Sequence, residues 1–179
     1  MIQRIQTLWL ALAFCCAVLC FLFPLAEYST VVESTGQEIK AQLNLLPKDN
    51  PEMMTQMAEG APVVDYSQRM SGFRTWPLTL LTVLWGAIAV GVIFLYRRRM
   101  TQMKIVSLGF LLNLVYVFLV FFWAVDAFAK LLAPMGGGEP HITWHVAAYA
   151  PIVSLLFFVL ARRGIRNDEA KVRAADRLR

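Results

Sequence analysis

The sequence predicts an all-α membrane protein, a four-transmembrane-helix bundle, from its charge pattern and its composition. Four runs contain no Asp, Glu, Lys or Arg: residues 8–26, 76–96, 105–125 and 142–161. Each run is close to the ~20 residues that a helix needs to cross ~30 Å of hydrocarbon. The composition agrees, because 58% of the residues are hydrophobic and 16% are charged, whereas soluble domains are about 45–50% apolar and about 25% charged.

The basic residues are sorted along the chain. Twelve of the 17 Lys and Arg residues lie before the first run, between the second and third, or after the fourth. Lys and Arg near the ends of spans mark the cytoplasmic side of a membrane. We therefore expect both termini and the loop 97–103 to be cytoplasmic. The net charge of +5 then reflects topology, and we expect no nucleic acid as a partner.

We interpret residues 1–179 as one domain. The expected spans are at about 6–26, 75–96, 104–126 and 142–162, with outer loops at 27–74 and 127–141 and a tail at 163–179.

The first span is expected to be a retained helix rather than a cleaved signal peptide. Its charge-free run is longer than the usual apolar region of a signal peptide, and no clean small-x-small cleavage pattern precedes Ala26. Pro24 marks the end of the helix. All three cysteines, Cys15, Cys16 and Cys20, lie in this span, so we expect small apolar packing residues and no disulfide.

The first outer loop is expected to contain a small extracytoplasmic β-hairpin. Residues 28–43 read as two short strands around a turn at Thr35-Gly36. An isolated hairpin is marginal in water, so it should lie over the outer ends of spans one and two or meet the second outer loop.

Spans two and three carry the features expected to govern helix packing. Ala87 and Gly91 form a small-xxx-small pair, which lets two helix backbones approach closely. Packing within the chain is favoured over a homodimer contact. Asn113, the most polar group at membrane depth, should hydrogen-bond a neighbouring helix. Asp126 and Lys130, four residues apart, should form an interfacial ion pair.

His141 and His145 lie at the start of the fourth span at a spacing of four, with Glu139 and Asp126 within plausible reach. On a helix, such a pair with a carboxylate could bind a metal. The glutamate of the HExxH motif is missing, because Ile142, Thr143 and Trp144 fill the gap. We therefore favour interfacial histidines and expect no metal and no cofactor.

The tail after Ala161 is expected to be a cytoplasmic C-terminal amphipathic helix. It combines seven bases with three acids, which suits a helix lying along anionic lipid headgroups. The order of the charges, ending in Asp176-Arg-Leu-Arg179, also suits a docked segment with salt bridges to the loop or to a partner.

Three segments carry a resemblance to a known family: 1–7 (MIQRIQT), 94–102 (FLYRRRMTQ) and 161–179 (ARRGIRNDEAKVRAADRLR). Together they resemble an uncharacterised family (a domain of unknown function) of small four-span inner-membrane proteins from Bacteroidota. The resemblance implies four spans and the inner membrane, and it implies no activity. Its recurrent residues cluster on the expected cytoplasmic face: Gln3, Arg4, Gln6, Arg99, Gln102, Ile165, Arg166, Asp168, Glu169, Val172, Arg173, Asp176, Arg177 and Leu178.

No set of nucleophile, base and charge stabiliser is apparent, so an enzyme is not expected. A transporter should carry ionisable groups inside its spans, and the four runs contain none of Asp, Glu, Lys or Arg. We therefore expect a scaffold or accessory subunit that contacts anionic headgroups and a protein partner, with an oligomeric transporter or channel component as the alternative. The expected partner-binding residues are Arg4, Arg97, Arg98, Arg99, Gln102, Arg166, Asp168, Glu169, Arg173, Asp176, Arg177 and Arg179.

Overall fold

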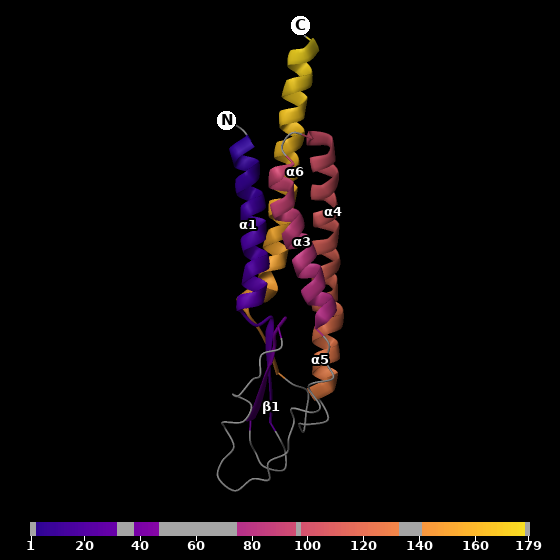
Figure 1. Ribbon diagram of the computed structural model, residues 1–179. Helices are drawn as coiled ribbons and strands as arrows, with labels where there is room; N and C mark the ends of the chain where they lie inside the picture. Colours follow the sequence, from indigo (N-terminus) through magenta and orange to yellow (C-terminus); the bar gives the residue numbers. More distant parts are fainter. Residues whose placement is uncertain (1–2, 32–37, 47–74, 96–97, 133–140, 178–179) are drawn as a thin grey trace.

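The computed structural model is a bundle of long helices with a small sheet at one end (Figure 1). It describes residues 3–31, 38–46, 75–95, 98–132 and 141–177. Four helices are long and apolar enough to cross a membrane, which confirms the predicted fold class. We call the end that carries the sheet the sheet end. The opposite end, where α1 begins and α6 ends, is the terminal end.

The helix bounds follow local sequence signals. Pro24, which cannot continue a helix, follows closely on the end of α1. Pro77 stands in the first turn of α3, where its missing N–H costs nothing. The helices are α1 (Gln3–Leu22), α3 (Trp76–Phe94), α4 (Arg99–Phe118), the π-helical turn η2 (Leu119–Ala124), α5 (Val125–Leu132) and α6 (Val146–Arg177).

The third span is longer than the sequence suggested. The segments α4, η2 and α5 follow one another without a break from Arg99 to Leu132, whereas the outer loop was expected from residue 127. The added residues, Ala127 to Leu132, are mostly good helix formers. The expected pair of Asp126 and Lys130 is confirmed: Lys130 Nζ lies 2.6 Å from Asp126 Oδ2, on the exposed surface of α5.

The hairpin prediction is confirmed, and the structure adds a third strand. β1 (Ala26–Val31) pairs antiparallel with β2 (Glu38–Leu43) and, on its other side, with β3 (His141–Trp144). The strand order is β2-β1-β3. Ala26 is opposite both Leu43 and Trp144. The turn expected at Thr35-Gly36 and the loop 47–74 lie outside the described residues.

β3 corrects the expected start of the fourth span. Residues 142–144 were assigned to the helix, but together with His141 they form a strand, and α6 begins at Val146. The segment His-Ile-Thr-Trp contains two β-branched residues and one aromatic residue, which favour a strand. The open edge of β1 supplies its hydrogen-bond partners. The sheet therefore joins the end of span one to the start of span four.

Side-chain hydrogen bonds hold the sheet onto the helices. The buried Tyr28 hydroxyl donates to the carbonyl of Val125, the first residue of α5, at 3.2 Å. Burial raises the pKa of the Tyr28 phenol above its usual range, so it is a neutral donor at physiological pH. The hydroxyls of Thr75 and Thr79 donate to the Leu45 carbonyl at 3.1 and 2.8 Å. This contact ties the residues after β2 to the start of α3.

Glycines set how closely the helices approach one another. A Cβ at Gly86 would lie 3.1 Å from Cβ of Ala17, so α1 and α3 are in close contact there. A Cβ at Gly109 would lie 2.8 Å from Cγ2 of Ile88 and 2.9 Å from Cε1 of Phe158. Gly109 therefore lets α4 pack against both α3 and α6.

The Ala87–Gly91 pair does not pack within the bundle. Ala87 is exposed, and nothing lies within 4 Å of a Cβ built on Gly91. The expectation that this pair packs inside the chain is wrong. Gly86, the immediate neighbour of Ala87, supplies the close contact instead, because it lies on the face of α3 that meets α1.

Candidate functional site

The start of α1, the end of α3, the start of α4 and the end of α6 lie at the terminal end of the bundle (Figure 1). The three basic segments of the sequence therefore converge on one end. α6 continues beyond the starts of α1 and α4 as a single straight helix (Figure 1). The tail is helical, as predicted, but it continues α6 along the bundle axis and does not turn to lie across the helix ends.

The surface of this tail is basic because its charged side chains are sorted by exposure. Arg162, Arg163, Arg166 and Lys171 are exposed, whereas Asp168 and Glu169 are half-buried. On a helix, residues three or four apart share a face, so Arg162, Arg163 and Arg166 are near neighbours. The part of the tail whose side chains are described thus presents bases outward.

The inner face of the tail is docked on α1. Gln6 is buried, and its Nε2 donates a hydrogen bond to Oδ2 of Asp168. A Cβ at Gly164 would lie 2.9 Å from Cγ of Gln6, and Ile165 is buried beside them. Asp168, which was predicted to pair with the loop 97–103 or with a partner, fixes the first turns of the tail to the N-terminal part of α1.

Gln102, one of the residues predicted to bind a partner, also makes an internal contact. It is 5% exposed, and its Nε2 donates to the Val92 carbonyl at 3.2 Å. Val92 lies in the last turn of α3, and its carbonyl also accepts a hydrogen bond from the Leu95 N–H at 3.1 Å. Gln102 thus caps α3 from α4. The basic neighbours of Gln102 gave it the appearance of a surface residue in the sequence.

The other predicted residues divide into three groups. Arg98 is exposed at the start of α4, as is Arg166 on α6, and Glu169 is half-buried. Arg97 and Arg179 lie outside the described residues. The third group lies on described helices, but the structure does not describe its side chains: Arg4, Arg99, Arg173, Asp176 and Arg177.

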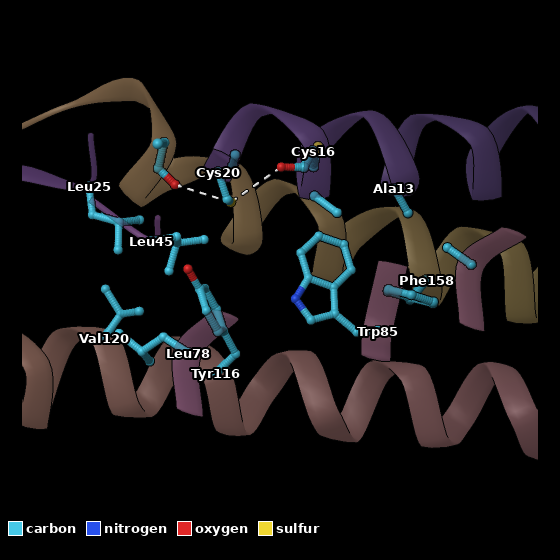
Figure 2. Packing of buried hydrophobic residues seen from close by; sticks show 14 of the residues in the cluster. Ala13, Cys16, Cys20, Leu25, Leu45, Leu78, Trp85, Tyr116, Val120 and Phe158 are labelled. Atoms are coloured by element: carbon cyan, nitrogen blue, oxygen red, sulfur yellow. Dashed lines mark hydrogen bonds between the residues drawn. The ribbon is translucent and has the colours of Figure 1, made fainter. Parts of the chain in front are cut away.

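A cluster of polar side chains at the centre of the bundle was not expected from the sequence. We call Cys20, Thr82, Trp85 and Tyr116 the polar centre; all four are fully buried. Figure 2 shows the Tyr116 hydroxyl pointing toward α1 and the Trp85 indole nitrogen facing the Tyr116 side. Neither Trp85 Nε1 nor Tyr116 Oη makes a hydrogen bond of normal geometry. The sequence places Tyr116 in span three, but it could not indicate that helices α1 and α3 direct polar groups to the same place.

Pro151 explains one hydrogen bond at this centre. A proline inside a helix has no N–H for the carbonyl four residues earlier, here that of Ala147 in the first turn of α6. The Cys20 thiol donates to this carbonyl at 3.7 Å and to the Cys16 carbonyl at 3.3 Å (Figure 2). In a membrane, such freed groups must find partners within the protein. Cys20 therefore joins α1 to α6.

The prediction for Asn113 is confirmed. Its Nδ2 donates to the Pro151 carbonyl at 3.0 Å and to Oγ of Ser154. Both partners are on α6, so this buried amide holds α4 and α6 together. In lipid, such an interhelical hydrogen bond contributes about 0.6–1.7 kcal/mol.

The two histidines do not share a helix face. His141 is exposed on β3, and His145 lies after the strand, where its Nε2 is 3.3 Å from Glu27 Oε2 of β1. Glu139 lies outside the described residues. Among the residues that are described, no group of three or more His, Cys, Asp or Glu could hold a metal ion. The i, i+4 helical geometry behind the metal hypothesis is therefore absent, and His145 instead links β1 to the start of α6.

Reporter fusions test on which side of the membrane the terminal end of the bundle lies. We predict that reporter fusions after Arg99 and at the C-terminus show cytoplasmic activity, because Lys and Arg are retained on that side. Fusions at Gly36 and Gly137 should show extracytoplasmic activity. Alkaline phosphatase and green fluorescent protein fusions measure the two sides. A C-terminal fusion active only as phosphatase would contradict the predicted orientation.

The four apolar helices, the polar contacts between them and the basic terminal end define a multi-pass membrane protein. Residues 2–178 match a family model described as Domain of unknown function (DUF4293). Because the match covers nearly the whole chain, the protein belongs to this family, and the predicted uncharacterised family is confirmed. A search of the curated proteins finds no match.

Proposed function

We propose that this protein is a scaffold or accessory subunit of a bacterial inner membrane, and that it holds a cytoplasmic protein partner on the tail of α6. The observation that carries the proposal is the length of α6, which continues beyond the starts of α1 and α4. α6 has 32 residues, which corresponds to ~48 Å of helix. A bilayer with its headgroups is about 40–45 Å thick, so a helix of this length that starts at one surface and runs along the membrane normal ends in the aqueous phase.

The way the tail is held also supports this proposal. A helix end that only anchored the chain to lipid would need bases but no particular docking contacts. Here, Gln6, Gly164 and Asp168 fix the tail to α1, and exposed bases face outward from that seam. A fixed helix loses less conformational freedom on binding a partner. The proposal assigns no reaction to the chain.

Site-specific photo-crosslinking tests the proposal. A photoreactive amino acid at Ala170 or Ala174, both exposed on the tail, should give discrete protein adducts in living cells. The same group at Val159, exposed on the apolar part of α6, serves as the control and should react with lipid. Lipid adducts alone at all three positions would contradict a protein partner.

A scrambled tail separates a specific partner from attraction by charge alone. Reordering residues 169–179 at constant composition keeps the net charge and leaves Gly164, Ile165 and Asp168 in place. We expect the adducts at Ala170 to disappear while the protein still accumulates in the membrane. Adducts that persist unchanged would show that residue order is irrelevant.

The polar centre favours the second candidate, a transporter or channel component. Polar groups at membrane depth commonly mark substrate paths, and Cys20, Thr82, Trp85 and Tyr116 lie together inside the bundle. The double substitution Trp85→Phe and Tyr116→Phe removes two of these groups without altering the tail. A cellular phenotype that follows this change, and not the scrambled tail, would favour transport over the scaffold role.

A further inference from the structure

The lipid-facing side of α6 changes from apolar to basic over a short distance. Ile152, Leu156 and Val159 are exposed, and Arg162, Arg163 and Arg166 are the next exposed residues at helical spacing. Successive steps of three or four residues keep this row on one side of the helix. The same side of α6 therefore carries a surface for acyl chains and, directly beyond it, three guanidinium groups.

The depth of the three arginines matches that of lipid phosphates. From Val146, where α6 begins, Arg162 is ~24 Å along the helix and Arg166 ~30 Å, at 1.5 Å per residue. The hydrocarbon core of a bilayer is about 30 Å thick. Arginine side chains extend from such positions toward the headgroups while their stems remain in apolar surroundings. With Val146 at the opposite edge of the hydrocarbon, their charges would lie at the height of the phosphates.

The arginines are available to an anion. Arg162 and Arg163 each share a helix face with Arg166 at a spacing of four and three residues, so their guanidinium groups can meet around one phosphate. None of the three forms an ion pair with another residue in the described part of the chain. The neighbouring acids, Asp168 and Glu169, are half-buried, and Asp168 accepts a hydrogen bond from Gln6.

We propose that Arg162, Arg163 and Arg166 form a binding site for the phosphate of an anionic phospholipid whose acyl chains lie along Leu156 and Val159. Guanidinium groups bind phosphate through paired, charge-assisted hydrogen bonds. The apolar row distinguishes a lipid from free phosphate, because only a lipid covers both surfaces. The site lies next to the proposed partner-binding tail but does not depend on a protein partner.

Native mass spectrometry of the purified full chain tests the site, with phosphatidylglycerol and phosphatidylcholine as probes. The wild type should retain phosphatidylglycerol in preference to phosphatidylcholine. The triple variant R162Q/R163Q/R166Q should lose phosphatidylglycerol occupancy by about tenfold or more, because several charge-assisted contacts are removed. The variant R162K/R163K/R166K, which keeps the charge but loses the paired geometry, should fall between them.

A matched control removes three other exposed bases, Arg98, Lys104 and Lys171, as R98Q/K104Q/K171Q. Non-specific attraction depends on the number of bases near the surface, whereas a site depends on their position, so this control should bind phosphatidylglycerol within about twofold of the wild type.

Equal losses in the two glutamine variants, or equal binding of both lipids by the wild type, would overturn the proposal. Displacement of the lipid by millimolar inorganic phosphate would overturn the lipid assignment in favour of a free-phosphate site. A scrambled tail that loses its protein adducts but keeps the lipid would separate this site from the proposed function.

Discussion

The substitution Gly109→Ala is expected to destabilise the bundle by about 1–3 kcal/mol, the usual cost of overpacking a tight core. The new methyl group would lie within 3 Å of Ile88 on α3 and of Phe158 on α6. Phe158 is fully buried, so its ring has little room to move. Unfolding in mixed micelles, followed by circular dichroism as the denaturing detergent increases, measures the change.

Gly91→Ala is the matched control for this prediction. Nothing lies within 4 Å of a Cβ at Gly91, and alanine is favoured over glycine within a helix by up to about 1 kcal/mol. This variant should therefore be as stable as the wild type or slightly more stable. A loss of stability at Gly91 equal to that at Gly109 would contradict the proposed helix packing.

Trp85→Ala is expected to cost about 3 kcal/mol or more, as is usual when a large buried aromatic side chain is truncated. Trp85 is fully buried and contacts Phe158 edge-on, with ring centroids 6.3 Å apart (Figure 2). Lipid cannot readily fill the space that the indole leaves between the helices, so its van der Waals contacts are lost. The same unfolding assay should show the loss.

Trp76→Ala is the control, because this tryptophan is 60% exposed at the start of α3. We expect a change within about 0.5 kcal/mol, which is typical of surface positions. Trp85→Phe should be milder than Trp85→Ala, since it keeps an aromatic ring and removes an indole N–H that has no hydrogen-bond partner. If the two alanine variants were equally stable, Trp85 would not be central to the core.

The existence of four spans could be read from the sequence because hydrophobic length and charge are local properties. The residues at which the spans begin and end were harder to predict. The third helix continues to Leu132 because the residues after Val125 favour a helix, whereas the expected span stopped at Asp126, where the charge-free run ends. The fourth helix starts late because its first three expected residues pair with a strand more than a hundred positions earlier. The local preference of these residues for a strand is weak, and the partner strand cannot be identified from the segment itself.

The candidate site was predicted in outline only. The charge distribution indicated which end of the bundle is basic, and the exposed arginines of α6 agree with it. The inward direction of Gln102 and the contact between Gln6 and Asp168 depend on how the helices are rotated. Near the end of a span, a glutamine that caps a neighbouring helix and one that faces water look alike in sequence. Helix rotation is a tertiary property, so these roles became visible only in the structure.

The central place of β1 in the sheet has a consequence for biogenesis. During synthesis, α1, β1 and β2 leave the ribosome early, whereas β3 appears only after three spans have been made. Until then, one edge of β1 has no partner, and an open strand edge invites pairing with other chains. Insertion of the last helix brings β3 to that edge. We expect chains that stop before residue 141 to be removed by quality control. Such chains lack β3, so the sheet that β1 and β2 begin keeps an open edge.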